Sequence, residues 1–352
     1  MKSINHTLLG FRGLLAFSVV IYHIFESAGI EGYIQRFSED SVLYLINYAG
    51  VISVDLFFVI SGYLIMQSLS TKRTLRQFAI NRLLRIYPVF LTIHLIIFVV
   101  GPLIGYKWMD GISVGAYVTH FVSNSLLLPG MLELPIAQIV AWSLSYEMFF
   151  YIIAGLIWFT YRSSKIRTYG KYSLYTLMFF SSVVIVYFHR DALFFVVGVA
   201  AYYSQTKWKR SGERHKALYL DGMIYLVAIY AAFHVMKAPL AVALGLSFLL
   251  FRTIIMEYGL LSLILRTKLM NYLGKISFSL YMWHTMVMFP LKKLMPKLSS
   301  LMDSSSTSFV LYMLMSLVLS LIVSHLSYNY IETRFTRKKV ESSANSSITP
   351  YF

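Results

Sequence analysis

The chain contains no cysteine among its 352 residues. Disulfide bonds, thiolate metal sites and cysteine nucleophiles are therefore excluded. Charged side chains are also scarce, at 13% of residues, whereas hydrophobic residues make up 58%. A soluble globular domain carries about 25% charged residues. We therefore predict an integral membrane protein.

Acidic residues are the scarcer sign of charge, with 15 Asp and Glu against 31 Lys and Arg, for a net charge of +16. Strong positive charge is typical of nucleic-acid-binding proteins, but such proteins gather it on a polar surface. Here the basic residues form short clusters between apolar runs. The pattern indicates membrane topology, and we expect no nucleic-acid partner.

Ten segments are long and apolar enough to cross a bilayer of about 30 Å. They are 7–26, 42–69, 83–104, 139–161, 172–189, 191–205, 217–236, 239–256, 271–291 and 308–331. We therefore predict an all-α polytopic membrane protein with about ten transmembrane helices in residues 1–339. The fifth and sixth segments are expected to form a tight hairpin, and the polar tail over 340–352 is predicted to be a disordered cytoplasmic tail.

Lys and Arg concentrate in alternate loops, namely those after the second, fourth, sixth and eighth segments and in the tail. Cytoplasmic loops carry this excess, so both termini are predicted to be cytoplasmic. On the opposite side, the stretch 105–138 contains an apolar run broken by Gly, Ser and Asn. It is interpreted either as a re-entrant segment over a cavity or as a peripheral interfacial helix.

Arg12 and His23 lie eleven residues apart in the first segment. Eleven residues advance a helix by about 16 Å and return it to nearly the same face. Arg12 is expected in the cytoplasmic half and His23 near the outer end. Ionisable groups inside a membrane are candidates for a functional site. The alternative is that Arg12 extends to the headgroups and His23 is interfacial.

Further polar residues recur at other membrane depths. Asp55 lies at middle to outer depth, where a carboxylate needs a partner. Ser61 and Gly62, nearer the cytoplasm, suit close helix packing or ligand approach equally well. Arg82 and Arg85, one turn apart at the cytoplasmic boundary, are either topological anchors or a phosphate clamp.

The remaining candidates lie in the second half of the membrane segments. Glu147 is expected about 12 Å below the outer surface. Tyr281 and His284 lie one turn apart near the middle of the membrane, although a lone His is usually a packing residue. Glu332 beside Arg334 is compatible with an interfacial ion pair. The His spacings contain no metal-binding motif, and we expect no metal centre.

These motifs together resemble the acyltransferase-3 family of bacterial inner-membrane acyltransferases, whose members commonly O-acetylate cell-surface glycans. The resemblance is carried, in the family's order, by FRGLLAFSVVIYH at 11–23, VDLFFVISGYLI at 54–65, RLLRIYP at 82–88, WSLSYEMFFY at 142–151, SFSLYMWH at 277–284 and YIETRF at 330–335. Two positions depart from the family pattern. Thr333 and Arg334 stand where the family usually has Pro after Glu-x, and Met148 replaces a second acidic residue.

The resemblance implies roles for individual residues. His23 is expected to be essential for catalysis and Arg12 for activity. Six residues are expected to bind the acyl donor or to be required for activity: Arg12, Arg82, Arg85, Ser61, Tyr281 and His284. Supporting or structural roles are assigned to four others: Asp55, Gly62, Trp142 and Ser143. Glu147 is assigned to catalysis, where it would orient the His23 imidazole or stabilise its protonated form.

The expected function is transfer of an acyl group, most simply acetyl, from cytoplasmic acetyl-CoA to a hydroxyl of an envelope saccharide. Lipopolysaccharide O-antigen, capsule and exopolysaccharide are compatible acceptors, and a lipid-linked saccharide is favoured. His23 would act as general base or, in a variant, as the acyl-carrying nucleophile. Acetyl-CoA is a co-substrate, and no cofactor is expected to be permanently bound.

A different class of function is also compatible with the pattern. Ten spans with intramembrane Arg, His, Asp and Glu suit a proton-coupled transporter of a sugar or lipid-linked saccharide. The chain has no recognisable inverted repeat, and the arginines gather at one face, which suits an anionic donor better.

Overall fold

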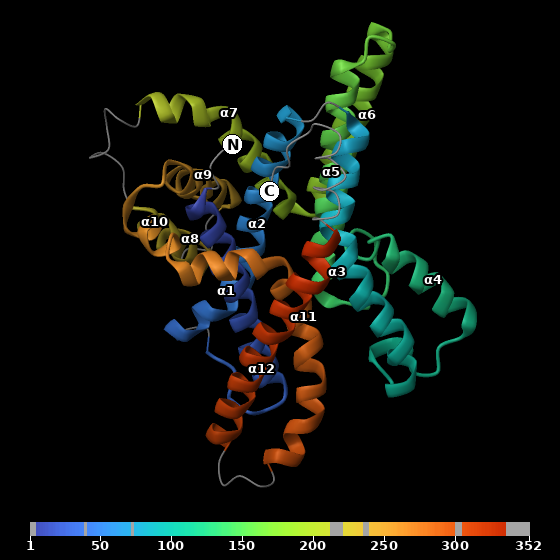
Figure 1. The fold of residues 1–352 in the computed structure, drawn as a ribbon, viewed down its shortest axis with the longest axis vertical. Coiled ribbons are helices and arrows are strands. Elements are labelled where there is room, and N and C mark those ends of the chain that lie inside the picture. Colours follow the sequence, from blue (N-terminus) through green and yellow to red (C-terminus); the bar gives the residue numbers. More distant parts are fainter. Residues whose placement is uncertain are drawn as a thin grey trace.

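The computed structural model describes residues 5–38, 41–71, 74–211, 221–234, 239–299 and 305–335, and every regular element within them is a helix (Figure 1). The principal helices are α1 His6–Ile30, α2 Leu45–Thr71, α3 Leu75–Ile104, α4 Val114–Ser125, α5 Trp142–Arg162, α6 Thr168–Phe188, α7 Leu193–Ser211, α8 Gly222–His234, α9 Leu240–Met256, α10 Gly259–Leu265, α11 Lys268–Ser299 and α12 Ser305–Ser327. Short turns complete the chain: η1 Val42–Tyr44, η2 Lys107–Met109, η3 Ile139–Ala141, η4 Arg190–Ala192 and the π-helical η6 Tyr328–Glu332. The all-α prediction is confirmed.

Six helices among the described residues are long and apolar enough to cross a membrane, and a seventh is added if α9 and α10 form one span bent by 62°. The chain is therefore a multi-pass membrane protein. A helix lies at each of the ten predicted segments, but α8 has only 13 residues, a length of about 20 Å. The count of about ten spans and the cytoplasmic termini stay predictions, and the tail over 340–352 lies outside the described residues.

The bend between α9 and α10 has a local backbone cause. Glu257 and Gly259 both have positive φ, 54° and 85°, so the helix cannot continue through them. Asp221 then holds the start of α10 next to the start of α8, because its carboxylate accepts hydrogen bonds from the backbone N–H groups of Met223, Leu260 and Leu261. One side chain thus caps the N-terminal ends of two helices.

The connection from α6 to α7 is short, but the two helices diverge from it and do not pack together as the tight hairpin that we expected. α7 packs along α2, and α6 lies beside α5. Gly62 makes the α2 and α7 contact possible, since a Cβ there would collide with the carbonyl oxygen of Phe195. Of the two interpretations of Gly62, close helix packing is therefore the one that the structure supports.

α1 packs along α11 at a similarly close distance. A Cβ added to Gly13 would lie 2.6 Å from the Gly274 nitrogen and 2.6 Å from the Met270 carbonyl oxygen. Only glycine permits this approach, which is typical of helix contacts in membranes. The contact fixes α1, which carries Arg12 and His23, against the helix that carries His284.

The stretch 105–138 contains the helix α4, which packs against α3 rather than against α1, α2 or α11 (Figure 1). Four apolar residues spaced four apart, Val114, Val118, Val122 and Leu126, are exposed on it. The buried Asn124 ties α4 to the following loop by donating to the Pro135 carbonyl and accepting from the Ala137 N–H, each at 2.9 Å. This arrangement favours the peripheral-helix interpretation.

Candidate functional site

Seven ionisable side chains gather in two groups. The first, here named the arginine cluster, consists of Arg12, Arg82, Arg85, Glu147 and Glu332. The second, here named the histidine pair, consists of His23 and His284. Both groups draw on α1, which contributes Arg12 to one and His23 to the other.

The arginine cluster brings together side chains from four elements, namely α1, α3, α5 and η6. Arg12 interacts electrostatically with Arg85, Glu332 and Glu147, and Arg85 interacts with both carboxylates in turn. Three guanidinium groups therefore face two carboxylates. The cluster keeps one positive charge in excess, in a region where charge is costly without a partner.

Glu147 is held in this cluster by two hydroxyl groups. Ser61 on α2 donates to its Oε1 atom at 2.9 Å, and the Tyr151 hydroxyl, one turn further along α5, donates to the same oxygen. The Tyr151 ring also lies 5.2 Å from the guanidinium carbon of Arg82, within the range of a cation–π contact. Ser61 therefore positions the carboxylate that faces the arginines.

Two arginine donors in the cluster have no partner among the described residues. The buried Nε atoms of Arg12 and Arg82 make no hydrogen bond, although Arg82 donates through Nη2 to the Leu64 carbonyl oxygen at 3.3 Å. A buried N–H group without an acceptor is unfavourable. These donors are therefore suited to bind oxygen atoms of an anionic ligand.

Glu332 is the functional candidate that sequence reasoning did not assign. Ser279 donates to its Oε2 atom at 2.9 Å, and Glu332 interacts electrostatically with Arg12 and Arg85. The sequence suggested its neighbour Arg334 as a partner instead. Glu332 ends a π-helical turn, an irregularity that occurs frequently at functional sites. A glutamate near the end of the last predicted span was the available signal.

In the histidine pair, the ring centroids of His23 and His284 lie 5.0 Å apart with an interplanar angle of 41°. His284 is fully buried, and its Nδ1 lies 3.1 Å from the Leu280 carbonyl oxygen. Its Nε2 is buried and has no hydrogen-bond partner among the described residues. His23 is half-buried, lies against Tyr22 at 4.8 Å and interacts electrostatically with Lys292.

Tyr281 and Ser143 lie between the two groups. The Tyr281 hydroxyl is 2.8 Å from the Ser143 hydroxyl and donates to the Val140 carbonyl oxygen at 3.1 Å. Tyr281 also interacts electrostatically with Glu147, and its ring is 6.2 Å from that of His284. A line of polar side chains thus connects the arginine cluster with the histidine pair.

Trp142 and Asp55 take no part in either group. The Trp142 ring packs against Phe58 and Tyr146, at 6.3 and 5.6 Å, which fits the structural role expected of it. Asp55 is buried, its Oδ2 has no hydrogen-bond partner among the described residues, and the charged group that acts on it is Asp191 of η4. The partner that a carboxylate at this depth needs is therefore not found for Oδ2 among these residues.

No hydrogen bond or ring contact joins Glu147 to His23 in the part of the chain that the structure describes. Glu147 accepts hydrogen bonds from Ser61 and Tyr151, and the His23 ring lies beside that of His284. Orientation of His23 by Glu147 therefore stays a prediction without a direct contact. Within the same residues, no group of three or more His, Asp or Glu side chains is arranged to hold a metal ion.

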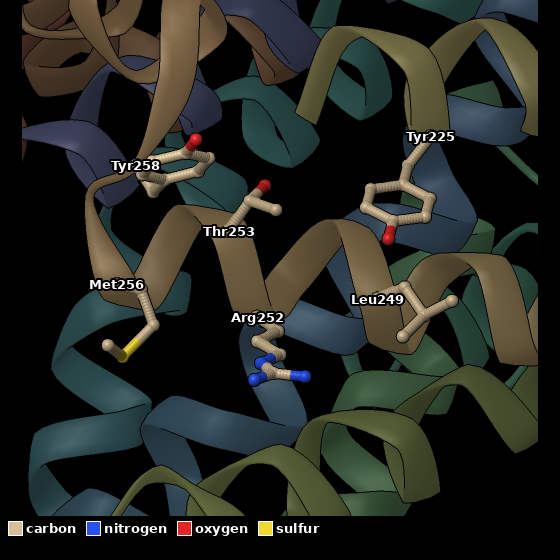
Figure 2. A pocket seen from close by; sticks show the side chains of 6 residues that line it. All are labelled: Tyr225, Leu249, Arg252, Thr253, Met256 and Tyr258. Carbon is tan, nitrogen blue, oxygen red and sulfur yellow. The ribbon is translucent and has the colours of Figure 1, made fainter. Parts of the chain in front are cut away.

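Two hollows of the molecule lie apart from these groups. The first, between α8 and α9, has a volume of about 20 Å³, and Figure 2 shows the side chains that line it, Tyr225 from α8 and Arg252, Thr253 and Met256 from α9 among them. This hollow is large enough for a single water molecule. The second, of about 420 Å³, is lined by apolar and aromatic side chains of α2, α5, α6 and α7, Phe150 and Trp158 among them. That lining suits hydrocarbon rather than phosphate.

Comparison with known proteins adds one finding. The model of the acyltransferase-3 family, described as an acyltransferase domain, matches residues 5–325. The match includes the arginines and histidines of both groups and ends shortly before Glu332. No curated protein and no solved structure matches the chain.

Proposed function

The chain belongs to the acyltransferase-3 family and is a membrane enzyme that transfers acyl groups, and we propose that it moves an acetyl group from cytoplasmic acetyl-CoA to a hydroxyl of a cell-envelope saccharide. The acceptor is a lipid-linked or nascent glycan such as O-antigen, capsule or exopolysaccharide. The enzyme lies in a bacterial inner membrane with both termini in the cytoplasm. Because the chain belongs to a family of acyltransferases, we favour this function over the proton-coupled transporter.

One observation carries the proposal: α1 presents Arg12 to a cluster with excess positive charge and His23 to a second, neutral pair. The two residues are eleven positions apart, about 16 Å along the helix. Coenzyme A has its phosphates at one end and its thioester at the other, joined by a flexible arm. A donor with its phosphates at the arginine cluster therefore presents its thioester toward the histidine pair, past Tyr281 and Ser143.

At the donor end, Arg12, Arg82 and Arg85 bind the anionic part of acetyl-CoA. Guanidinium groups offer fixed, paired N–H donors that match phosphate oxygens. Support comes from the unpartnered Nε atoms of Arg12 and Arg82 and from the excess charge of the cluster. Glu147 and Glu332 partly neutralise the arginines, so the cluster remains stable while the site is empty.

At the acceptor end, His23 acts as general base. Its neutral imidazole takes the proton of the acceptor hydroxyl while the hydroxyl oxygen forms a bond with the thioester carbonyl carbon. The carbon–sulfur bond then breaks, and the proton passes from His23 to the departing thiolate. The products are the acetyl ester and coenzyme A, with all atoms accounted for.

The donor assignment is tested by thermal unfolding of the detergent-solubilised protein with and without saturating coenzyme A. Binding to the folded state raises the melting temperature. We expect an increase in melting temperature for the wild type and a smaller increase for Arg85→Gln. The control Arg162→Gln should show the same increase as the wild type, because the Arg162 guanidinium lies 4.9 Å from the Trp158 ring and takes no part in the cluster. No increase for the wild type would overturn the donor assignment.

The acceptor assignment is tested in cells. Surface glycans from strains with and without the chain are compared by mass spectrometry for acetyl esters. Acetyl groups that depend on the chain support the assignment. Identical glycans in the two strains would contradict it.

A further inference from the structure

We propose that His284 is the positioning residue of His23, accepting a hydrogen bond from its imidazole through Nε2. The proposal deepens the proposed function and rests on it, because His23 is there the general base. It gives His284 a task in the acceptor half of the reaction, in place of the donor side.

The tautomer of His284 follows from its backbone contact. The Leu280 carbonyl oxygen, 3.1 Å from Nδ1, can only accept a hydrogen bond, so Nδ1 carries the hydrogen atom. In a neutral imidazole, the other nitrogen then has a free lone pair. His284 therefore presents Nε2 as an acceptor.

That acceptor is unsatisfied and faces few candidates. Nε2 is buried without a partner among the described residues, and the side chain is fully buried. An unpaired buried polar atom is unfavourable, so a donor nearby is expected. The two aromatic rings in contact with His284 belong to His23 and Tyr281, at centroid distances of 5.0 and 6.2 Å. The Tyr281 hydroxyl already donates to the Val140 carbonyl oxygen, which leaves His23 as the donor.

Other titratable groups near the histidine pair do not supply an acceptor for the hydrogen atom of the His23 imidazole. Tyr22 and Glu26 interact with each other on α1, and Lys292 on α11 lies 3.5 Å from Glu31. Lys292 also opposes a positive charge on His23. On α2, the charged group that acts on Asp55 is Asp191. His284 is therefore the neutral acceptor that would stabilise the protonated imidazole of His23.

The consequence for the reaction is a defined orientation of His23. When one ring nitrogen donates its hydrogen to His284, the other has a lone pair for the acceptor hydroxyl. Once His23 has taken the hydroxyl proton, its hydrogen bond to His284 becomes charge-assisted and stronger. The carboxylate of a Ser-His-Asp triad performs the same task for its histidine.

Two substitutions at His284 separate hydrogen bonding from packing. His284→Leu keeps an apolar side chain of similar size but removes the acceptor, and His284→Gln retains an acceptor oxygen. We expect His284→Leu to lower kcat about 100-fold, as for lost acid–base assistance, with little change in KM for acetyl-CoA. His284→Gln should recover about tenfold of that loss, the fold-change of one hydrogen bond.

The matched control is His94→Leu. His94 is also buried, and its Nε2 lies 2.9 Å from the Ser125 hydroxyl, on α3 and α4 away from the pair. We expect normal kcat for this variant. A kcat for His284→Leu equal to that of the control would overturn the proposal, as would equal losses in the Leu and Gln variants.

A second measurement needs no enzymatic activity. Diethyl pyrocarbonate modifies neutral imidazoles, and mass spectrometry of the full-length protein gives the rate of modification at His23. A hydrogen-bond acceptor on the opposite nitrogen makes the imidazole more nucleophilic, so the rate should fall in His284→Leu and recover in His284→Gln. Unchanged rates in both would contradict the proposal even if acyl transfer were observed. Changed rates without any acyl transfer would contradict only the proposed function.

Discussion

Replacement of Glu147 by Gln is the sharpest perturbation of the arginine cluster. The amide retains an oxygen that can accept from Ser61 and Tyr151, so the shape and both hydrogen bonds are preserved. The negative charge is lost. Three guanidinium groups then face only the carboxylate of Glu332, and the excess positive charge rises from one to two.

The size of the effect follows from these contacts. A hydrogen bond to a charged group contributes about 1 kcal/mol more than one to a neutral group, and two such bonds are weakened. The loss of two such contributions amounts to about 2 kcal/mol, so we expect a fall of about 2 kcal/mol in the free energy of unfolding. The melting temperature should decrease by several degrees.

The same substitution should increase the effect of coenzyme A. The added positive charge attracts the donor phosphates more strongly, so coenzyme A should raise the melting temperature of Glu147→Gln by more than that of the wild type. The assay is thermal unfolding in detergent at low salt, with Glu133→Gln as the control, since Glu133 is exposed in the loop between α4 and η3. An unchanged melting temperature, or a smaller increase with coenzyme A, would refute the idea that Glu147 is a counter-ion of the arginines.

Two further predictions concern the elements that support the site. Gly13→Ala places a methyl group 2.6 Å from the Gly274 nitrogen. The substitution should lower the free energy of unfolding by about 1–3 kcal/mol and lower activity, because it pushes α1 away from α11. Gly115→Ala is the control, since Gly115 has open space around it; equal activity in the two variants would contradict a packing role for Gly13. Burial acts to raise the pKa of Asp221, but three backbone N–H donors hold this pKa below its ordinary value. Its stabilisation is therefore present above the ordinary carboxyl pKa and is lost as pH falls through the lowered one. Asp221→Asn should lower the melting temperature at neutral pH by the equivalent of about 1 kcal/mol. The difference in melting temperature between wild type and variant should become smaller as the pH is lowered. A difference that stays constant with pH would contradict the role of the Asp221 carboxylate as a charged cap.

Local periodicity made several features predictable. The positions of the helices follow from apolar runs, and the placement of Arg12 and His23 on one helix follows from their spacing of eleven residues. The close helix packing at Gly62 was one of two interpretations that a Ser-Gly pair allows. These are properties of one segment or of a neighbouring turn.

Features that depend on packing between distant segments were not predictable in the same way. Glu332 interacts electrostatically with Arg12 because the π-helical turn η6 packs against α3 and α11. His284 meets His23 because Gly13 and Gly274 bring α1 and α11 into close contact. The sequence pattern contains each residue but does not say which helices are neighbours. The expectation that Glu147 orients His23 therefore stays a prediction, and the hydrogen bonds to Glu147 in the structure come from Ser61 and Tyr151.

The catalytic role of His23 is measured by transfer of labelled acetyl from acetyl-CoA to the host glycan, in cells that produce wild-type protein or His23→Ala at equal levels. We predict transfer by the wild type and, for His23→Ala, a loss of at least about 100-fold, the contribution of a general base. His94→Leu serves as a control with normal transfer. Acetylation by His23→Ala at the wild-type level would contradict the catalytic role of His23.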